Sequence, residues 1–336
     1  MDEFQRLEEY VCRSYGSLLS ELPRLEVKAC NPEYFVVAGL GGSGIVGRLL
    51  EAACAKKWGR PFVFIDGSED TLVLNGNYVL LAVSFSGNTI ETLRAYSQHR
   101  AGAAAAAVVS NGGELVKIAE RTGDSILLAG EAPAPRFGLP SMLEKAVLFF
   151  ARSTGAEWVL DEFRVAVKEG PWSKPSELVH SSKKLVTETG RAVPVFYGAE
   201  HTKWAAYRWK TQVNENAKSP AFHSILPEAN HNEVNGWVSA PDNADIRPFV
   251  MTSDVYSKLT KAAISAYKKA SGKRCVDIAL SSETALGQII EACCLGDVYS
   301  LELAKARGAN PSDISVLESA KKETNRILSE QKSGEH

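Results

Sequence analysis

The sequence predicts an α/β protein of two lobes, each a three-layer αβα unit with a mainly parallel sheet flanked by helices. Three observations predict this class. Short apolar runs alternate with helix-like segments, the alternation occurs in both halves of the chain, and 336 residues suffice for about two domains. Because the strand-like runs are apolar throughout, each sheet is expected to be buried on both faces.

The first lobe is predicted to span residues 1–154 and to begin with a helix at 2–22. Apolar residues at helical spacing indicate that helix, namely Phe4, Leu7, Tyr10 and Val11. Five strands are expected to follow, at 35–38, 61–65, 79–83, 104–109 and 125–128. A long helix at 140–154 is expected to close the lobe.

Residues 155–190 are predicted to join the lobes. The stretch 155–175 is typical of a linker because it carries two glycines and two prolines, and a polar helix is expected at 176–189. The second lobe is predicted at 191–336, with strands at 193–197, 247–252 and 275–280 and a helix from 201. Its tail, 321–336, is expected to be frayed at its end.

Composition excludes several classes of protein. The chain has 38 basic and 40 acidic residues, so it lacks the basic excess of a dedicated nucleic-acid binder. It has no apolar run approaching the roughly 18 residues of a membrane helix, and it starts with acidic residues where a signal peptide would be basic. Its six cysteines show neither CxxC nor zinc-like spacing. We therefore expect a cytoplasmic enzyme without a metal.

Gly39-Leu40-Gly41-Gly42-Ser43-Gly44 follows a predicted strand and opens a predicted helix. Such a loop brings backbone N–H groups and the helix N-terminus close to an anion. The segment also satisfies GxGxxG, and Asp66 ends the next strand 22 residues after Gly44, where it could meet a ribose hydroxyl. An NAD-dependent oxidoreductase is therefore one candidate.

Ser84-Phe85-Ser86-Gly87-Asn88-Thr89 follows the third predicted strand and precedes another helix. Its hydroxyls and free N–H groups suit a phosphate monoester. Asn88 and Glu91 fit a helix N-cap and its third-position partner, which would be a structural role. Two neighbouring loops that favour one anion indicate a phosphorylated small molecule rather than a dinucleotide.

The pairing of these two loops resembles the sugar isomerase (SIS) domain. Further residues follow in a fixed order: Pro135-Arg136, Glu215-Asn216-Ala217-Lys218, His231-Asn232 and Lys305-x-x-Gly308. The whole set looks like the bifunctional phosphoglucose/phosphomannose isomerases, known mainly from archaea, over nearly the entire chain. The resemblance implies two SIS lobes in a homodimer without a cofactor. It implies interconversion of glucose 6-phosphate and mannose 6-phosphate with fructose 6-phosphate through a cis-enediol.

The resemblance also assigns roles to individual residues. Five would hold the substrate phosphate, namely Gly42, Ser43, Ser84, Ser86 and Thr89. Glu215 would move a proton between C1 and C2, and Arg136 would stabilise the enediolate charge. His231, contributed by the partner subunit, and Lys305 would assist opening of the sugar ring.

One position departs from the family, and two other functions stay open. Tyr299 stands where some relatives carry a threonine that gives room for either C2 epimer, which puts activity on the mannose epimer in question. The first other function is the oxidoreductase that would use the GxGxxG loop. The second is a phosphosugar-binding SIS module without activity, although the DNA-reading module that usually accompanies such sensors is not evident.

Overall fold

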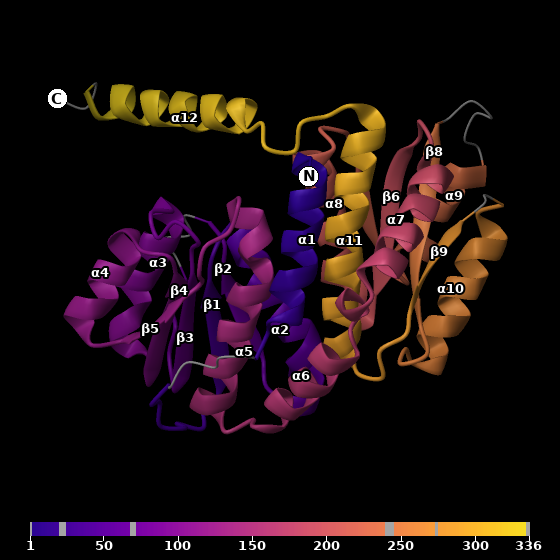
Figure 1. Cartoon of the computed structure of the whole chain (residues 1–336). Coiled ribbons are helices and arrows are strands. Elements are labelled where there is room, and N and C mark those ends of the chain that lie inside the picture. Colours follow the sequence, from indigo (N-terminus) through magenta and orange to yellow (C-terminus); the bar gives the residue numbers. More distant parts are fainter. Residues whose placement is uncertain (1, 20–24, 68–71, 239–244, 273–274, 334–336) are drawn as a thin grey trace.

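The computed structural model describes residues 2–19, 25–67, 72–238, 245–272 and 275–333. Two parallel sheets stand beside each other, sheet A with the strand order β2-β1-β3-β4-β5 and sheet B with the order β7-β6-β8-β9 (Figure 1). The predicted class, two α/β lobes with parallel sheets, is confirmed. Within the described residues, no helix is long and apolar enough to cross a membrane.

Sheet A contains the five strands expected for the first lobe. They are β1 (Tyr34–Ala38), β2 (Phe62–Ile65), β3 (Tyr78–Val83), β4 (Ala105–Ser110) and β5 (Ser125–Leu128). Helices α2 (Gly41–Trp58) and α5 (Leu139–Thr154) cover one face, and α3 (Ile90–His99) and α4 (Gly113–Thr122) cover the other. Neighbouring residues of β1 therefore enter different cores: Phe35 packs with α2 and α5, and Val36 packs with α3 and α4.

Sheet B consists of β6 (Val193–Ala199), β7 (Phe222–Leu226), β8 (Ile246–Ser253) and β9 (Val276–Leu280). Its helices are α8 (Lys203–Asn216), α9 (Glu233–Val238), α10 (Lys258–Ala270) and α11 (Ala285–Arg307). The sequence did not predict β7, because His223 and Ser224 interrupt its apolar run and Phe222 is exposed at this sheet edge.

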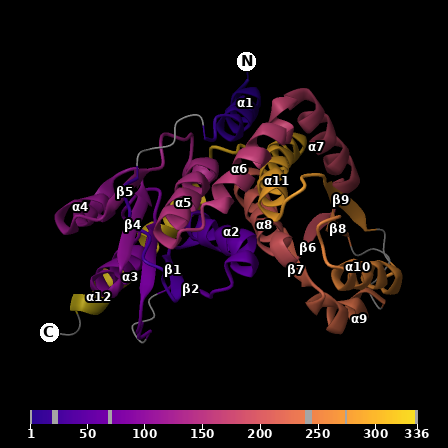
Figure 2. The same ribbon diagram turned by 90° about the horizontal axis from the view of Figure 1, so that it is seen from below.

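The segment expected to be a linker contains a helix, α6 (Trp158–Glu169), before the expected polar helix α7 (Pro175–Thr189). It forms because Val159, Leu160, Phe163 and Ala166 line one face and are buried in the core between the sheets. Together with α2, α8 and α11, whose buried residues belong to the same core, α6 lies between the two sheets (Figures 1 and 2).

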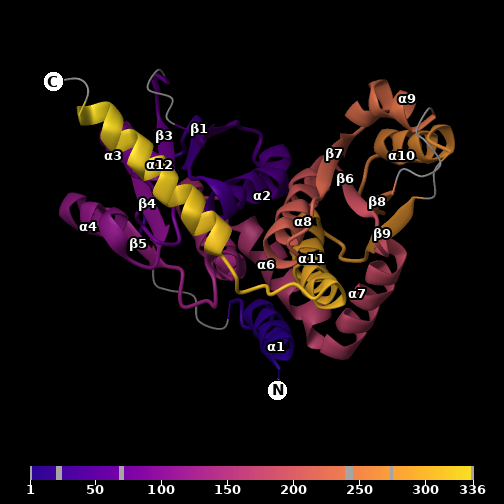
Figure 3. The same cartoon turned by 90° about the horizontal axis from the view of Figure 1, so that it is seen from above.

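The first and last helices both extend beyond the lobes to which the sequence assigned them. The opening helix α1 (Glu3–Gly16) packs against α11 of the second lobe, where the Tyr15 hydroxyl donates to Asp297 at 3.1 Å. Helix α12 (Ser315–Ser333) begins before the tail at 321–336 and extends through most of it. The end of that tail, residues 334–336, lies outside the described part. Figures 1 and 3 show α12 crossing above sheet A.

The two sheets run in opposite directions. The short helix η2 (Pro135–Gly138) follows β5 at the C-terminal edge of sheet A. Its Arg136 donates to Asn216, at the end of the helix that returns from β6 to the start of β7. The C-terminal edge of sheet A therefore meets the N-terminal edge of sheet B, and the candidates Arg136 and Glu215 lie at this junction.

Candidate active site

The glycine-rich loop lies between β1 and β3, where the direction of strand order reverses and open α/β sheets bind their ligands. Glycine is required at Gly44, because a Cβ there would lie 2.6 Å from the Gly39 carbonyl oxygen. Gly41 adopts a φ of 59°, and Gly41 and Gly42 are exposed. The N-terminus of α2 is thus open to an anion.

The β3 loop is joined directly to the glycine loop. Ser43 Oγ accepts a hydrogen bond from the Phe85 backbone N–H at 3.1 Å. Ser84 Oγ lies 3.0 Å from Thr89 Oγ1 and accepts from the Gly87 N–H at 3.1 Å. The structure therefore brings Ser43, Ser84 and Thr89 together at the N-termini of α2 and α3, with the exposed Ser86 in the same loop.

Asn88 has a structural role, but not the expected one. The N-cap of α3 is Thr89, which makes no side-chain capping bond. Asn88 Oδ1 instead accepts from the Glu114 N–H at 3.1 Å in the first turn of α4. The expected capping by Asn88 is wrong because the turn places α3 one residue later.

Arg136 lies next to this loop, because η2 packs on Phe85. A Cβ on Gly138 would come within 2.3 Å of the Phe85 ring. The Arg136 side chain is 4% exposed, and its Nη1 lies 3.6 Å from Glu215 Oε2. Burial lowers the pKa of Arg136 and the nearby Glu215 opposes that shift, but a guanidinium keeps its charge at any relevant pH.

Glu215 occupies the last turn of α8, and its side chain is 33% exposed. The chain turns sharply after it, since Lys218 adopts a φ of 51°. Lys218 Nζ donates to the Glu215 carbonyl oxygen at 2.5 Å and to the Asp313 carbonyl oxygen at 2.6 Å. Lys218 thus ties the end of α8 to the segment after α11, a role that no sequence pattern indicated.

Further residues, which the sequence did not predict as part of the site, form hydrogen bonds that fix Arg136 on the side away from Glu215. Arg136 Nε donates to Asn216 Oδ1 at 2.7 Å, and Nη2 donates to the Pro311 carbonyl oxygen at 2.6 Å. Arg208 donates to the Arg136 carbonyl oxygen at 2.9 Å and pairs with Asp297 at 2.8 Å. These partners lie 72 to 175 residues from Arg136 in sequence, so spacing could not reveal them.

His231 does not join these residues within one chain. It ends η5 (Glu228–His231), just after the C-terminal end of β7, and is exposed. Glu215 lies at the opposite, N-terminal edge of the same sheet. Five strand residues separate these edges, a length of about 16 Å.

Lys305 and Tyr299 make other contacts in the structure. Lys305 is in the last turn of α11, where its charge acts on Glu8 of α1. Burial and the neighbouring Glu302 raise the pKa of Glu8 to about 7, and Lys305 opposes that shift. Tyr299 is fully buried in the core and bonds to Thr189 Oγ1 at 2.7 Å, so its ring does not face the site.

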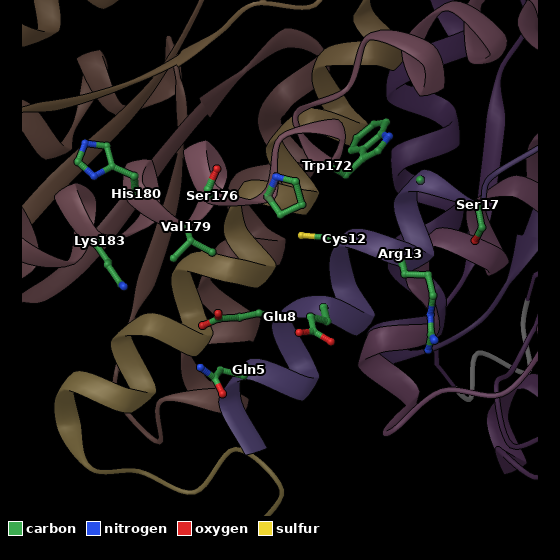
Figure 4. A pocket seen from close by; sticks show the side chains of 13 residues that line it. Gln5, Glu8, Cys12, Arg13, Ser17, Trp172, Ser176, Val179, His180 and Lys183 are labelled. Atoms are coloured by element: carbon green, nitrogen blue, oxygen red, sulfur yellow. The ribbon is translucent and has the colours of Figure 1, made fainter. Parts of the chain in front are cut away.

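A large groove of about 1320 Å³ lies between α1 and α7, and Figure 4 shows it with Glu8 and Lys183 among its walls. None of the predicted phosphate-binding or catalytic residues lines it. A smaller cavity of about 300 Å³ lies beside the glycine loop and contains Arg48 and Asp66. Asp66 there pairs with Arg48 at 2.9 Å. Among the described residues, no group of three or more His, Cys, Asp or Glu could hold a metal ion.

Comparisons with known proteins identify the family of the chain. The family model for the bacterial phospho-glucose isomerase C-terminal SIS domain matches residues 179–324. A bifunctional phosphoglucose/phosphomannose isomerase of Thermoplasma volcanium is 30% identical over 86% of this chain and 90% of its own length. A D-glucosamine-6-phosphate 4-epimerase of Sulfolobus acidocaldarius is 34% identical over 68% of this chain and 71% of its own length.

The fold is that of solved SIS proteins. The tagatose-6-phosphate ketose/aldose isomerase of Escherichia coli superposes with a TM-score of 0.64 at 14% identity, covering 92% of this chain and 93% of that one. The sequence matches, which cover most of the chain, show which family within this fold it belongs to. The chain therefore belongs to the bifunctional phosphoglucose/phosphomannose isomerase family of enzymes.

Proposed function

We propose that the protein interconverts glucose 6-phosphate and mannose 6-phosphate with fructose 6-phosphate. The observation that carries the proposal is the meeting of two hydroxyl-rich helix N-termini with the Arg136–Glu215 pair at one sheet edge. The first group suits a phosphate, and the second suits proton transfer beside a developing negative charge. The family relationship supports the same reaction.

The phosphate is proposed to bind between α2 and α3. Ser43, Ser84, Ser86 and Thr89 supply hydroxyl donors, and Gly42 supplies a backbone N–H at the start of α2. Both helix dipoles favour an anion at this point. A phosphate held there fixes the sugar so that its C1 and C2 extend toward η2 and the end of α8.

Glu215 is proposed to remove the proton from C2 of the open-chain aldose and return it to C1, which turns the aldose into the ketose. The negative charge that develops on oxygen in the cis-enediol is stabilised by Arg136, whose Nη1 lies 3.6 Å from the carboxylate. One base can serve both carbons because they are adjacent. No electron acceptor is needed, since the oxidation of one carbon balances the reduction of the other.

His231 is proposed to act across a homodimer interface. Because it lies at the other edge of sheet B from Glu215 within one chain, it would have to enter the site of a second copy. Lys305 is proposed to assist ring opening, as the resemblance implies. Its position beside Glu8 gives no independent support for that role.

The direct test is an assay of the purified protein with each of the three hexose 6-phosphates. We expect fructose 6-phosphate to form from both the glucose and the mannose compound. Since Tyr299 is buried in the core, it does not restrict the C2 epimer by direct contact. Binding of fructose 6-phosphate without turnover would instead favour a sensor.

Mixed dimers test the origin of His231. We expect His231→Ala and Glu215→Gln chains to be nearly inactive separately. After mixing and re-association, each hybrid dimer should regain one intact site, with up to half of the wild-type rate per hybrid. Two inactive parents that stay inactive in a verified hybrid would contradict sharing of the site.

The Sulfolobus relative makes an epimerase the second candidate function. That activity would invert C4 of glucosamine 6-phosphate rather than move a carbonyl between C1 and C2. Nuclear magnetic resonance of the protein incubated with glucosamine 6-phosphate separates the two functions. We expect no 4-epimer, and its appearance without any fructose 6-phosphate isomerisation would reverse the assignment.

A further inference from the structure

We infer that Asn216 is the positioning residue of Arg136, and that its side chain must be an amide rather than a carboxylate so that the arginine charge stays available to the reaction. The inference deepens the proposed function and rests on it. It concerns a residue that contacts neither the phosphate loops nor the reacting carbons in the proposed mechanism, but holds a group that does.

Arg136 is held by neutral acceptors. Nε donates to the amide oxygen of Asn216 at 2.7 Å, and Nη2 donates to the Pro311 carbonyl oxygen at 2.6 Å. The remaining nitrogen, Nη1, faces Glu215, whose carboxylate is 3.6 Å away and one-third exposed. Two of the three guanidinium nitrogens are thus fixed, and the third faces the proposed reaction centre.

The orientation of the Asn216 amide is itself fixed. Its Nδ2 donates to Ser300 Oγ at 2.8 Å, and the Ser300 hydroxyl donates to the Asp297 carbonyl oxygen at 2.8 Å. Asn216 and Ser300 are both fully buried. A flipped amide would place its NH₂ against the arginine N–H and leave buried donors without acceptors, which is costly. The series of hydrogen bonds from α11 through Ser300 to Asn216 therefore sets the position of Arg136.

A second buried arginine shows the alternative arrangement. Arg208 lies behind Arg136 and contacts both oxygens of Asp297, at 2.8 and 3.1 Å. Its charge is therefore compensated within the fold, as buried ion pairs require. Among the described residues, the hydrogen-bond partners of Arg136 are the Asn216 amide and the Pro311 carbonyl, and neither is a carboxylate. The structure thus pairs one arginine with a carboxylate inside the fold and directs the charge of the other toward the partly exposed Glu215 at the site.

This difference is what an enediolate requires. A cation stabilises developing charge most when it is fixed beforehand in a water-poor site and is not already neutralised. Displacement of such a group by about 1 Å costs up to 10²-fold in rate. The effect of Asn216 should consequently be on kcat, since the phosphate loops that dominate substrate binding are on sheet A and do not contact it.

The test compares Asn216→Ala, Asn216→Asp and Ser300→Ala with Asn214→Ala as the matched control. Asn214 lies on the same helix but donates to the Ser219 carbonyl oxygen at 2.8 Å, away from Arg136. We expect Asn216→Ala to lower kcat about 10- to 100-fold with KM for fructose 6-phosphate within about threefold of wild type. The control should keep kcat within about twofold.

Asn216→Asp separates position from charge. It retains an oxygen toward Arg136 but introduces a buried carboxylate that would pair with the guanidinium, so we expect a kcat loss of about 10²-fold or more. An Asn216→Asp enzyme faster than Asn216→Ala would overturn the requirement for an amide. It would show that a fixed arginine suffices whatever its net charge.

Ser300→Ala keeps the inference testable if an Asn216 variant fails to fold. We expect it to lower kcat about two- to tenfold, and to add little in the Asn216→Ala background because both act through one arginine. Additive losses in that cycle, or unchanged kcat in a folded Asn216→Ala, would overturn the positioning role. Absence of activity in the wild-type protein would instead overturn the proposed function.

Discussion

The two lobes share one architecture but differ in what fills the point where the strand order reverses. The order β7-β6-β8-β9 of sheet B repeats the order β2-β1-β3-β4 of sheet A. Register makes the comparison residue by residue, since Ala38 pairs with Ala82 and Tyr197 pairs with Val250. Gly41 lies three residues after Ala38 and Glu200 lies three residues after Tyr197, so these two positions are equivalent. Likewise Thr89 is equivalent to Ser257, and they are the N-caps of α3 and α10.

In the second lobe, the Glu200 carboxylate occupies the start of the helix whose counterpart is open in the first lobe. Glu200 has the left-handed backbone of its counterpart, with a φ of 43° against 59° for Gly41. Its carboxylate accepts from the Ser257 N–H at 3.0 Å, at the start of α10. The equivalent helix start in the first lobe, at Thr89, has no side-chain capping bond. Identical topology thus leaves one helix N-terminus open to a ligand and the other already bonded to a carboxylate.

The largest expected effect tests whether proton transfer takes place only at the junction between sheet A and sheet B. Glu215→Gln should lower kcat about 10³-fold, because an amide cannot accept the proton from carbon. Glu200→Gln, at the C-terminal edge of sheet B, is the matched control and should keep kcat within about twofold. Steady-state kinetics with fructose 6-phosphate measures both variants. A Glu215→Gln enzyme with the full rate would contradict the mechanism.

A smaller effect separates the two sets of loops in substrate binding. Ser86→Ala should raise KM for fructose 6-phosphate about tenfold, the value of one hydrogen bond to a charged group. Asp254→Asn changes the register-equivalent position of the second lobe and should leave KM unchanged. Competition by inorganic phosphate should weaken in parallel for Ser86→Ala alone. An equal KM change in both variants would place phosphate in both lobes.

The pH dependence of stability tests whether the Glu200 carboxylate stabilises the second lobe. Burial by itself would raise the pKa of Glu200, but hydrogen bonds from Thr260 and Ser257 outweigh it and lower that pKa. A lowered carboxylate pKa stabilises the fold above the ordinary pKa, and the contribution is lost as pH falls through the folded-state value. Glu200→Gln should therefore lower the free energy of unfolding by about 1 kcal/mol near neutral pH.

Urea unfolding of the wild type and Glu200→Gln at several pH values measures this difference. The two proteins should converge in stability as pH falls below about 4, the ordinary range of a glutamate. A difference that persists unchanged in acid would mean that Glu200 acts through packing rather than charge.

The smallest effect concerns the oxidoreductase alternative. Asp66 and Arg48 form a partly exposed pair at 2.9 Å, with side chains 54% and 28% exposed. Asp66→Ala should leave isomerase kcat and KM within about twofold and cost less than about 1 kcal/mol of stability. Calorimetry with NAD should detect no binding to either protein. Saturable NAD binding that Asp66→Ala abolishes would revive the alternative.

Sequence reasoning worked where structure depends on neighbouring residues. Apolar runs predicted the five strands of sheet A, and glycines and hydroxyls predicted the loop after β1 and the loop after β3. It missed β7, whose polar His223 and Ser224 are tolerated at a sheet edge, and it placed a linker where α6 forms. In both cases tertiary packing, rather than local preference, decided the element.

The sequence by itself determined two parallel α/β lobes and the glycine- and hydroxyl-rich loops of the first. Through the family resemblance it also predicts Arg136 and Glu215 as site residues. Only the tertiary structure decided which side chains meet. Opposite sheet directions bring Glu215 to Arg136, leave His231 at the far edge, and turn Lys305 toward Glu8. The physical reason is that backbone pattern is local, whereas the bonds linking Arg136 to Asn216 and Pro311 span 80 and 175 residues.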